Sequence, residues 1–371
     1  MTSAELATLT QQVLWAVFGV GLAFGALVQR TGFCTMGAVS DAVVVGDWTR
    51  ARQWALAAGV ATLGFALLAY AGLLRAPQTL YASTRWLWLS ALAGGAVFGF
   101  GMVLSSGCVS KTLVRVGGGN LKALVVVLVT GIAAFATLKG LTAVWRVNTV
   151  DRVAADFAAN ADIATLLAGG TGLAPGTAAL GAGGVVGAAL LAFALSTRES
   201  RRPINLLAGA GVGALVLAMF WITGHLGHLA EHPETLEETW LATNSTRAEG
   251  LSFVGPVGFA LDWILFYSDA GKRLTVGIVS VAGVVLGSAA MAFVRRSFRW
   301  EGFAGTTDLG HHLAGGAMMG IGGVTALGCS IGQGVSGFAT LTLTSLLAAA
   351  AMVGGALAAV KYQMWRLERE T

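Results

Sequence analysis

The sequence predicts an all-α polytopic membrane protein built from two related halves. Hydrophobic residues make up 56% of its 371 residues and charged residues 11%, with a mean hydropathy of +0.75. An ordinary soluble domain has about 25% charged residues, and its core could not cover this much apolar surface. The 53 glycines fall inside apolar runs, which is typical of closely packed membrane helices or of helix breaks beside a cavity.

Nine stretches are long and apolar enough to span a bilayer, which takes about 20 residues per helix. They are residues 10–29, 53–74, 88–107, 121–142, 176–195, 205–225, 273–294, 310–328 and 341–361. Spans one to four align with spans six to nine, and the fifth span connects them. We therefore expect a single membrane domain over 1–371, with a first repeat half at 1–150, a connector at 151–204 and a second half at 205–371.

The third and eighth spans carry the repeat on which this division depends. Residues 92–112 read LAGGAVFGFGMVLSSGCVSKT, and residues 313–333 read LAGGAMMGIGGVTALGCSIGQ. Both begin with LAGGA and reach Gly-Cys at the same offset, at Cys108 and Cys329. A weaker copy, GALVQRTGFC, ends at Cys34; in the second half Ile222 takes that place. Polar or glycine-rich residues follow each strong copy directly, which suggests re-entrant turns or discontinuous helices.

Lysine and arginine residues indicate the orientation in the membrane. They follow spans one, three, five, seven and nine, whereas the loop at 231–249 is acidic. The positive-inside rule then places the C-terminus in the cytoplasm and the N-terminus outside, and an odd number of spans makes the two halves inverted. We expect the polar stretch 225–272 to form an outer loop with short surface helices. Five basic residues on the outer side run against this orientation: Arg75, Arg85, Lys139, Arg146 and Arg152.

The three cysteines are the strongest candidates for a functional site, because each ends a glycine-rich apolar segment. A lone cysteine in a membrane span is most often a small apolar filler, but three in related places indicate a shared role. A thiol is a weak donor with a polarisable sulfur. A row of thiols in a pore therefore favours a soft, sulfur-bearing anion over a hard oxyanion, and weak binding at each lets the solute leave.

Groups that favour an anion surround the two repeat cysteines. If short helices begin after Cys108 and Cys329, their free N–H groups and positive dipole ends would face a bound anion. Lys111 adds a cation, although an ordinary cytoplasmic lysine explains it equally well. Gln333 could donate a hydrogen bond, or could make a polar contact between helices. The candidate backbone donors lie near Gly107, Gly328 and Gly332.

Other chemistry has little support in the sequence. The five histidines fall in two groups, at 225–232 and 311–312, and neither offers the ligand set of a metal site. Asp41 and Asp47 are either caps of a short helix or acids coupled to protons. No Walker, G-x-S-x-G or H-E-x-x-H motif is present. We expect no metal, no cofactor, no catalytic residue and, at a net charge of +5, no nucleic-acid partner.

Four segments resemble the YeeE/YedE family, a thiosulfate-transporter group of bacterial inner-membrane proteins. They are TGFCTMGAVSDA at 31–42, SSGCVSKTLVRVGGGNLKALVV at 105–126, SFRWEGF at 297–303 and LAGGAMMGIGGVTALGCSIGQGVSG at 313–337. The resemblance implies a nine-span, hourglass-shaped protein with re-entrant helices around a central path. It also implies uptake of thiosulfate by hand-over between Cys34, Cys108 and Cys329. Related proteins often accompany a TusA-like sulfur carrier, which is the partner we expect on the cytoplasmic side.

We therefore predict a multi-pass transporter of the bacterial inner membrane, not an enzyme, that relays thiosulfate or a similar small sulfur anion into the cytoplasm. One alternative is a membrane sulfur relay, or sulfurtransferase-type protein, in which a cysteine carries a persulfide. Lys111 near Cys108 is the feature that favours it. A second alternative is a transporter of a selenium or other sulfur compound. A third is a channel for neutral solutes in which the cysteines only pack.

Overall fold

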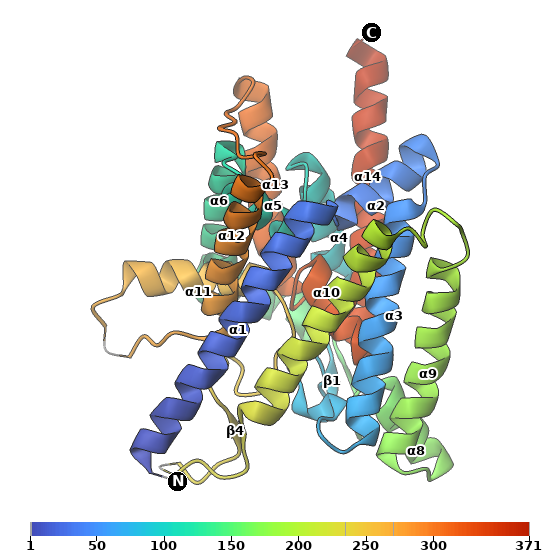
Figure 1. The fold of residues 1–371 in the computed structure, drawn as a ribbon, viewed down its shortest axis with the longest axis vertical. Helices are drawn as coiled ribbons and strands as arrows, with labels where there is room; N and C mark the ends of the chain where they lie inside the picture. The colour runs from blue at the N-terminus through green and yellow to red at the C-terminus, as the bar shows by residue number, and fades with distance from the viewer. Residues whose placement is uncertain (1, 234, 270, 371) are drawn as a thin grey trace.

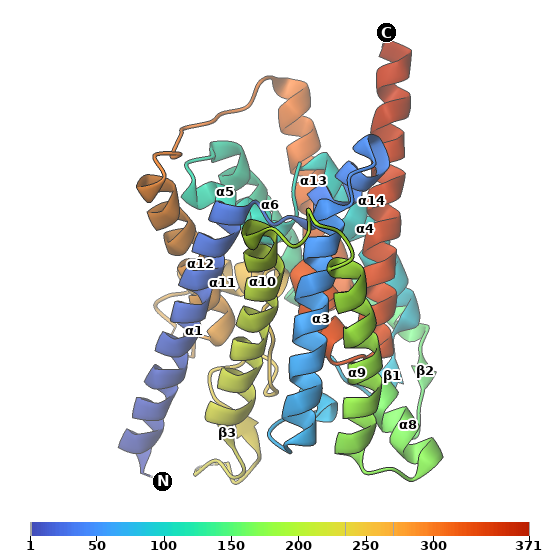
Figure 2. The ribbon, with the colours of Figure 1, turned by 45° about the vertical axis from the view of Figure 1, so that its right-hand side comes forward.

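The computed structural model describes residues 2–233, 235–269 and 271–370, and helices dominate it (Figures 1 and 2). The elements up to the connector are α1 (Ser3–Thr31), α2 (Thr35–Ser40), η1 (Asp41–Val45), α3 (Thr49–Tyr70), η2 (Ala76–Gln78), β1 (Arg85–Trp86), α4 (Trp88–Leu104), α5 (Val109–Gly117), α6 (Leu121–Lys139), α7 (Leu141–Asn148), η3 (Val150–Arg152), β2 (Ala155–Asp156), α8 (Ile163–Thr171) and α9 (Pro175–Ala194). The second half contains α10 (Pro203–Trp221), η4 (Ile222–Leu226), β3 (His228–Leu229), β4 (Thr239–Trp240), α11 (Val254–Leu265), α12 (Val276–Val294), α13 (Thr306–Thr325), η5 (Gly332–Gly337) and α14 (Leu343–Glu370).

Each predicted span corresponds to one long helix, which confirms an all-α polytopic membrane protein. Within the described residues, eight helical stretches are long and apolar enough to cross a membrane. The helix that falls short is α13, which has 20 residues but carries Asp308, His311 and His312 in its first two turns. The two chain termini lie at opposite ends of the long axis (Figure 1), as an odd number of crossings requires.

Helices α4 and α13 cross at the centre, and their glycines show that the two halves are inverted copies. A Cβ atom built on Gly94 would lie 2.7 Å from the carbonyl oxygen of Gly322, and one on Gly322 would lie 2.6 Å from that of Gly94. Gly101 and Gly315 face each other in the same way, at 2.7 and 2.6 Å. Gly94 is the repeat equivalent of Gly315, and Gly101 of Gly322. The contact between Gly94 and Gly322 therefore recurs between their equivalents, Gly315 and Gly101, with the two helices exchanged. A two-fold axis between antiparallel helices requires this pattern.

The same symmetry extends to the surrounding helices. Gly95 and Gly99 of α4 approach the backbone of α14, and their equivalents Gly316 and Gly320 of α13 approach α6. Helix α1 packs on α12, and its equivalent α10 packs on α3. Small residues let membrane helices approach this closely, and dispersion contacts then hold them together. The connector helix α9 packs on α3, outside this symmetric arrangement.

The stretch 225–272, which the sequence predicted to be an outer loop with surface helices, packs partly into the helix bundle. Residues 225–272 do form a ribbon in which β3 pairs with β4. However, α11 contacts α6, α12 and α13, and the chain just before it is fully buried at Leu251 and Phe253. Because α11 is mostly apolar, it packs against the bundle instead of lying on the surface. The prediction of surface helices alone was wrong here.

Candidate functional site

Each strong repeat ends in the same turn, immediately before its cysteine. The N–H of Ser106 donates to the carbonyl three residues earlier (3.1 Å), and that of Gly107 donates to the carbonyl five residues earlier (2.8 Å). Leu327 and Gly328 make the same two bonds, at 3.1 and 2.7 Å, which is the Schellman closure of a helix. Ser106 and Leu327 both have left-handed backbones, with φ of 57° and 61°. The equivalent turns thus direct the chain into a short second helix in both halves.

Cys108 is the N-cap of the short helix α5. Its carbonyl accepts the N–H of Thr112 at 2.9 Å, so the helix starts there, and the N–H groups of the first turn lack partners within the helix. The Cys108 side chain is 1% exposed, and its Sγ lies 3.2 Å from the hydroxyl oxygen of Ser110. A thiol, a hydroxyl and the positive end of a helix therefore lie together in a buried place.

Cys329 begins the equivalent helix in the second half. Its Sγ accepts the N–H of Gly332 at 3.4 Å and lies 4.0 Å from the hydroxyl of Ser252, and the side chain is 0% exposed. The helix then widens into the π-helical turn η5. A Cβ atom on Gly332 would lie 2.5 Å from the Ser252 oxygen, so this position has room only for glycine.

Cys34 repeats this arrangement at the start of α2. Helix α1 ends at Gly32, whose φ is 71°, and the Cys34 sulfur accepts the N–H of Gly37 at 3.4 Å. Cys34 is half-buried, whereas Cys108 and Cys329 are buried. In Cys34 and Cys329 a sulfur lone pair is engaged by a backbone amide, which leaves the S–H proton available to donate to an anion.

Electrostatic interactions link the three thiols, since Cys108 acts on both Cys34 and Cys329. Lys111, which is half-buried, interacts in the same way with Cys34 and Cys108. Arg50 lies beside Cys34 and pairs with Asp41 at 3.1 Å. Among the residues that the structure describes, no carboxylate forms an ion pair with Lys111.

Gln333 lies in the wall of the site. Its side chain is 1% exposed, and its Nε2 donates to the carbonyl of Ala326 at 2.8 Å. The amide therefore ties η5 to the end of α13, which is the polar helix contact that the sequence left as one of two possibilities. Its Oε1 is buried and accepts no hydrogen bond from any residue in the described ranges.

Two cavities lie near the two equivalent turns. One, of about 280 Å³, is lined by Ser252, Leu327 and Gly328, next to Cys329 in the chain. The other, of about 480 Å³, is polar and contains Arg115, whose guanidinium donates to the carbonyl of Ser106 at 3.3 Å.

A buried glutamate and a half-buried arginine line the first cavity. Glu249 accepts the N–H groups of Asn244 and Ser245 at 2.9 and 3.0 Å, and burial raises the pKa of its carboxyl group. Arg146, which also lines the cavity, pairs with Asp151 at 3.5 Å. The sequence offered no signal for these residues, since only the fold brings them to the turn before Cys329.

The remaining sequence candidates have structural partners elsewhere. His228 contacts Glu238 at 2.8 Å, and His311 contacts Arg366 at 2.9 Å. Asp47 caps the start of α3 by accepting the N–H of Thr49 at 2.9 Å. In the described parts of the chain, no three His, Cys, Asp or Glu side chains are grouped as metal ligands would be.

Comparison with known proteins places this geometry among sulfur transporters. The sequence profile of a family described as "Sulphur transport" matches residues 30–358. The thiosulfate transporter TsuA of Spirochaeta thermophila is 27% identical over 347 residues, which cover 91% of this chain and 94% of that protein. The thiosulfate transporter TsuA of Escherichia coli is 25% identical, over 87% and 86% of the two chains. The probable transporter YedE of Salmonella typhimurium is 33% identical over 104 residues, 28% of this chain and 24% of that protein.

Proposed function

We propose that the chain, which belongs to the sulphur transport family, takes up thiosulfate or a similar small sulfur-containing anion into the cytoplasm. Two full-length relatives that are thiosulfate transporters, together with the membrane helices, support a sulfur-anion membrane transporter and not an enzyme. The observation that carries the finer proposal is the group of three thiols. Each stands at the start of a short helix, and Cys108 interacts with the other two.

The positions of the cavities suggest the order in which the anion meets the thiols. We place the cavity of about 280 Å³, which Ser252 and Gly328 line beside Cys329, on the outer side of the membrane, so Cys329 receives the anion first. Cys108 is next, and the half-buried Cys34 is last. At each step an S–H group donates to the terminal sulfur of the anion, and the next thiol replaces the one before it. The weak donor strength of a thiol keeps each site shallow, as conduction requires.

The surrounding charge favours an anion over a neutral solute. The half-buried Lys111 faces Cys34 and Cys108, and the helix that starts at Cys108 directs its dipole toward them. In a partly buried site such a charge is worth several kcal/mol, since two unit charges 4 Å apart interact by about 4 kcal/mol at an effective dielectric of 20. The proposed backbone contribution comes from the amides near Gly107, Gly328 and Gly332.

Inward movement of a dianion needs an energy source. An inside-negative potential of 100 mV opposes each negative charge by about 2.3 kcal/mol, which is about 4.6 kcal/mol for two charges. Either an ion moves with the substrate, or a cytoplasmic reaction removes the substrate. A TusA-like sulfur carrier at the cytoplasmic end would provide the second route.

Uptake by the purified protein in liposomes tests the proposed substrate. The wild type should take up ³⁵S-labelled thiosulfate, and a tenfold excess of unlabelled thiosulfate should compete with the label whereas sulfate should not. Competition by sulfate as strong as by thiosulfate would contradict thiol-based recognition. Intact-mass measurement after turnover separates the persulfide alternative, because a covalent relay leaves an added sulfur atom on a cysteine and the proposed hand-over leaves none.

A further inference from the structure

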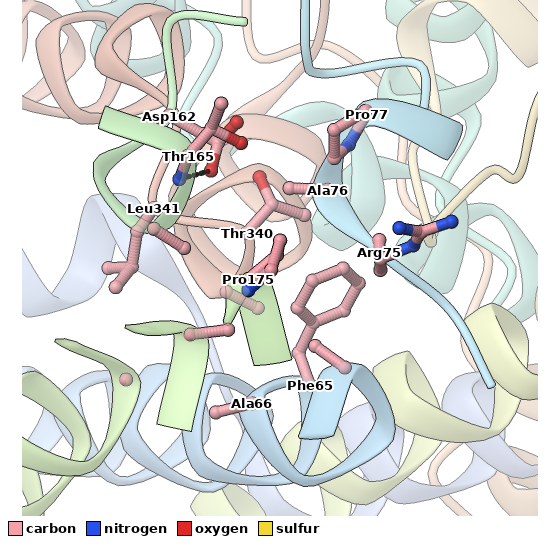
Figure 3. Close-up of a pocket in the computed structure, with 15 residues that line it drawn as sticks. Phe65, Ala66, Arg75, Ala76, Pro77, Asp162, Thr165, Pro175, Thr340 and Leu341 are labelled. Atoms are coloured by element: carbon pink, nitrogen blue, oxygen red, sulfur yellow. Dashed lines mark hydrogen bonds between the residues drawn. The ribbon is translucent and has the colours of Figure 1, made fainter. Parts of the chain in front are cut away.

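A cavity of about 190 Å³ lies between α3, α8, α9 and the segment that joins η5 to α14 (Figure 3). Its lining is mostly apolar, and the labelled side chains in Figure 3 include Phe65, Pro175 and Leu341. Only two residues of this lining carry charge, Asp162 and Arg75, and they lie on opposite sides of the cavity. The proposed path of the anion does not use either residue.

Asp162 is a buried carboxylate with one engaged oxygen and one free oxygen. Its side chain is 0% exposed. Oδ1 accepts the N–H of Thr165 at 2.9 Å and thereby caps α8, whereas Oδ2 accepts no hydrogen bond from any residue in the described ranges. An ionised oxygen in such surroundings is unfavourable, because burial removes its hydration without replacing it. Burial accordingly raises the pKa of the Asp162 carboxyl group.

The backbone around Asp162 is fastened to the end of the re-entrant segment that starts at Cys329. Ile163 donates its N–H to Leu341 at 3.1 Å, and Leu343 donates to Ala161 at 2.9 Å. These two bonds link the backbone on either side of Asp162 to the segment between η5 and the start of α14.

A second backbone strap elsewhere in the chain contains an acid that is engaged. Leu121, just after α5, donates its N–H to the carbonyl of Glu301 at 2.9 Å. There the side-chain amide of Asn120 donates to the Glu301 carboxylate at 2.5 Å. The acid of this second strap is hydrogen-bonded, whereas Oδ2 of Asp162 is not.

We propose that Asp162 binds a proton, and that this proton couples thiosulfate uptake to a proton gradient by shifting the re-entrant segment that begins at Cys329. The inference rests on the proposed function, for which it supplies the missing ion coupling. A proton is favoured over a metal ion because the other lining residues offer no second carboxylate. Arg75 is the only other charged group that faces the cavity from α3, η2, α8, α9 or residues 339–341, and it would repel a metal cation.

Asp162→Asn separates proton binding from the structural role of the residue. Asparagine caps helices as well as aspartate does, so the bond to Thr165 should persist, but the side chain can no longer titrate. In proteoliposomes, a gradient of one pH unit, acid outside, should raise wild-type thiosulfate accumulation about tenfold for each coupled proton. The Asp162→Asn protein should accumulate the same amount with and without the gradient. Asp47→Asn is the matched control, because Asp47 also caps a helix but is exposed, and it should respond like the wild type.

A response of Asp162→Asn to the gradient equal to that of the wild type would overturn the proposal. A second measurement does not depend on transport: thermal unfolding in detergent between pH 4 and pH 8. A carboxyl group whose pKa is raised in the folded state stabilises the fold at low pH, and this stability is lost as the pH rises through the folded pKa. The buried carboxyl group of Glu249 contributes such a loss in both proteins, so the loss should be larger in the wild type than in Asp162→Asn. If the wild type takes up no thiosulfate, the proposed function fails but the proton site is still tested by unfolding. Identical pH profiles of stability for the wild type and Asp162→Asn would then reject the proton site as well.

Discussion

Replacing Gly322 by alanine tests how the two halves are joined. A Cβ atom at this position would lie 2.5 Å from the backbone nitrogen of Phe98 and 2.6 Å from the carbonyl oxygen of Gly94. Carbon contacts are normally about 3.5–4.0 Å, so α4 and α13 would have to separate by about 1 Å along their crossing. Over-packing of this kind costs about 1–3 kcal/mol.

A second glycine of the same helix provides the control. Nothing lies within 4 Å of a Cβ atom on Gly310, so Gly310→Ala gains helix propensity, about 1 kcal/mol, without a steric cost. Because Gly322→Ala gains a similar propensity, the difference between the two variants isolates the crossing. We expect Gly322→Ala to be less stable than Gly310→Ala by about 1–3 kcal/mol in SDS-induced unfolding from mixed micelles.

The inverted symmetry makes the test sharper. Gly101 is the repeat equivalent of Gly322, and its Cβ would lie 2.7 Å from the Gly315 carbonyl oxygen. Gly101→Ala should therefore be destabilised to a similar extent. Equal stability of Gly322→Ala and Gly310→Ala would refute the close crossing, and a large effect at only one of Gly101 and Gly322 would refute its symmetry.

Three further predictions follow from the site. Lys111→Met should slow anion uptake at least about tenfold, the rate equivalent of about 1.4 kcal/mol, without loss of thermal stability. Lys111→Arg, which keeps the positive charge, should retain most of the rate. An unchanged rate in Lys111→Met would show that the lysine does not act on the path. Gly332→Ala should reduce uptake because its Cβ would lie 2.5 Å from the Oγ atom and 2.9 Å from the Cβ atom of Ser252. The double variant with Ser252→Gly, which removes both atoms, should recover, so failure to recover would place the damage elsewhere. Ser106→Gly should raise the free energy of unfolding by up to about 1–2 kcal/mol, because glycine adopts the left-handed backbone of this position without strain. Ser106→Ala should bring no such gain, and equal stability of the two variants would contradict strain at this turn.

The central crossing could be predicted because glycine spacing is a local pattern with a direct packing consequence. The copies at 92–112 and 313–333 place glycines on matching helix faces, and the structure pairs Gly94 with Gly322 as an inverted repeat requires. The repeat also identified α13, which hydropathy alone would have missed. The degenerate third copy has a physical counterpart as well, since α1 ends at Gly32 but α10 continues through Phe220 into η4.

Contacts between distant segments could not be predicted in this way. Ser252 meets Cys329 only because α11 packs against α6 and α13, and the sequence indicates a surface loop there. The free oxygen of Asp162 depends on a strap to residues 341–343, and its sequence surroundings show nothing unusual. Gln333 could be singled out by its spacing from Cys329, but its bond to Ala326 follows from the geometry of the turn.

The most direct test of a relay through three thiols is the initial rate of labelled thiosulfate uptake by the single variants Cys34→Ala, Cys108→Ala and Cys329→Ala. The proteins should be compared at matched amounts in liposomes of the same composition. If the thiols act in series, each variant should lose at least about tenfold of the wild-type rate, because no parallel route bypasses a missing step. A wild-type rate in all three variants would show that the cysteines only pack, and a wild-type rate in one would remove that thiol from the path.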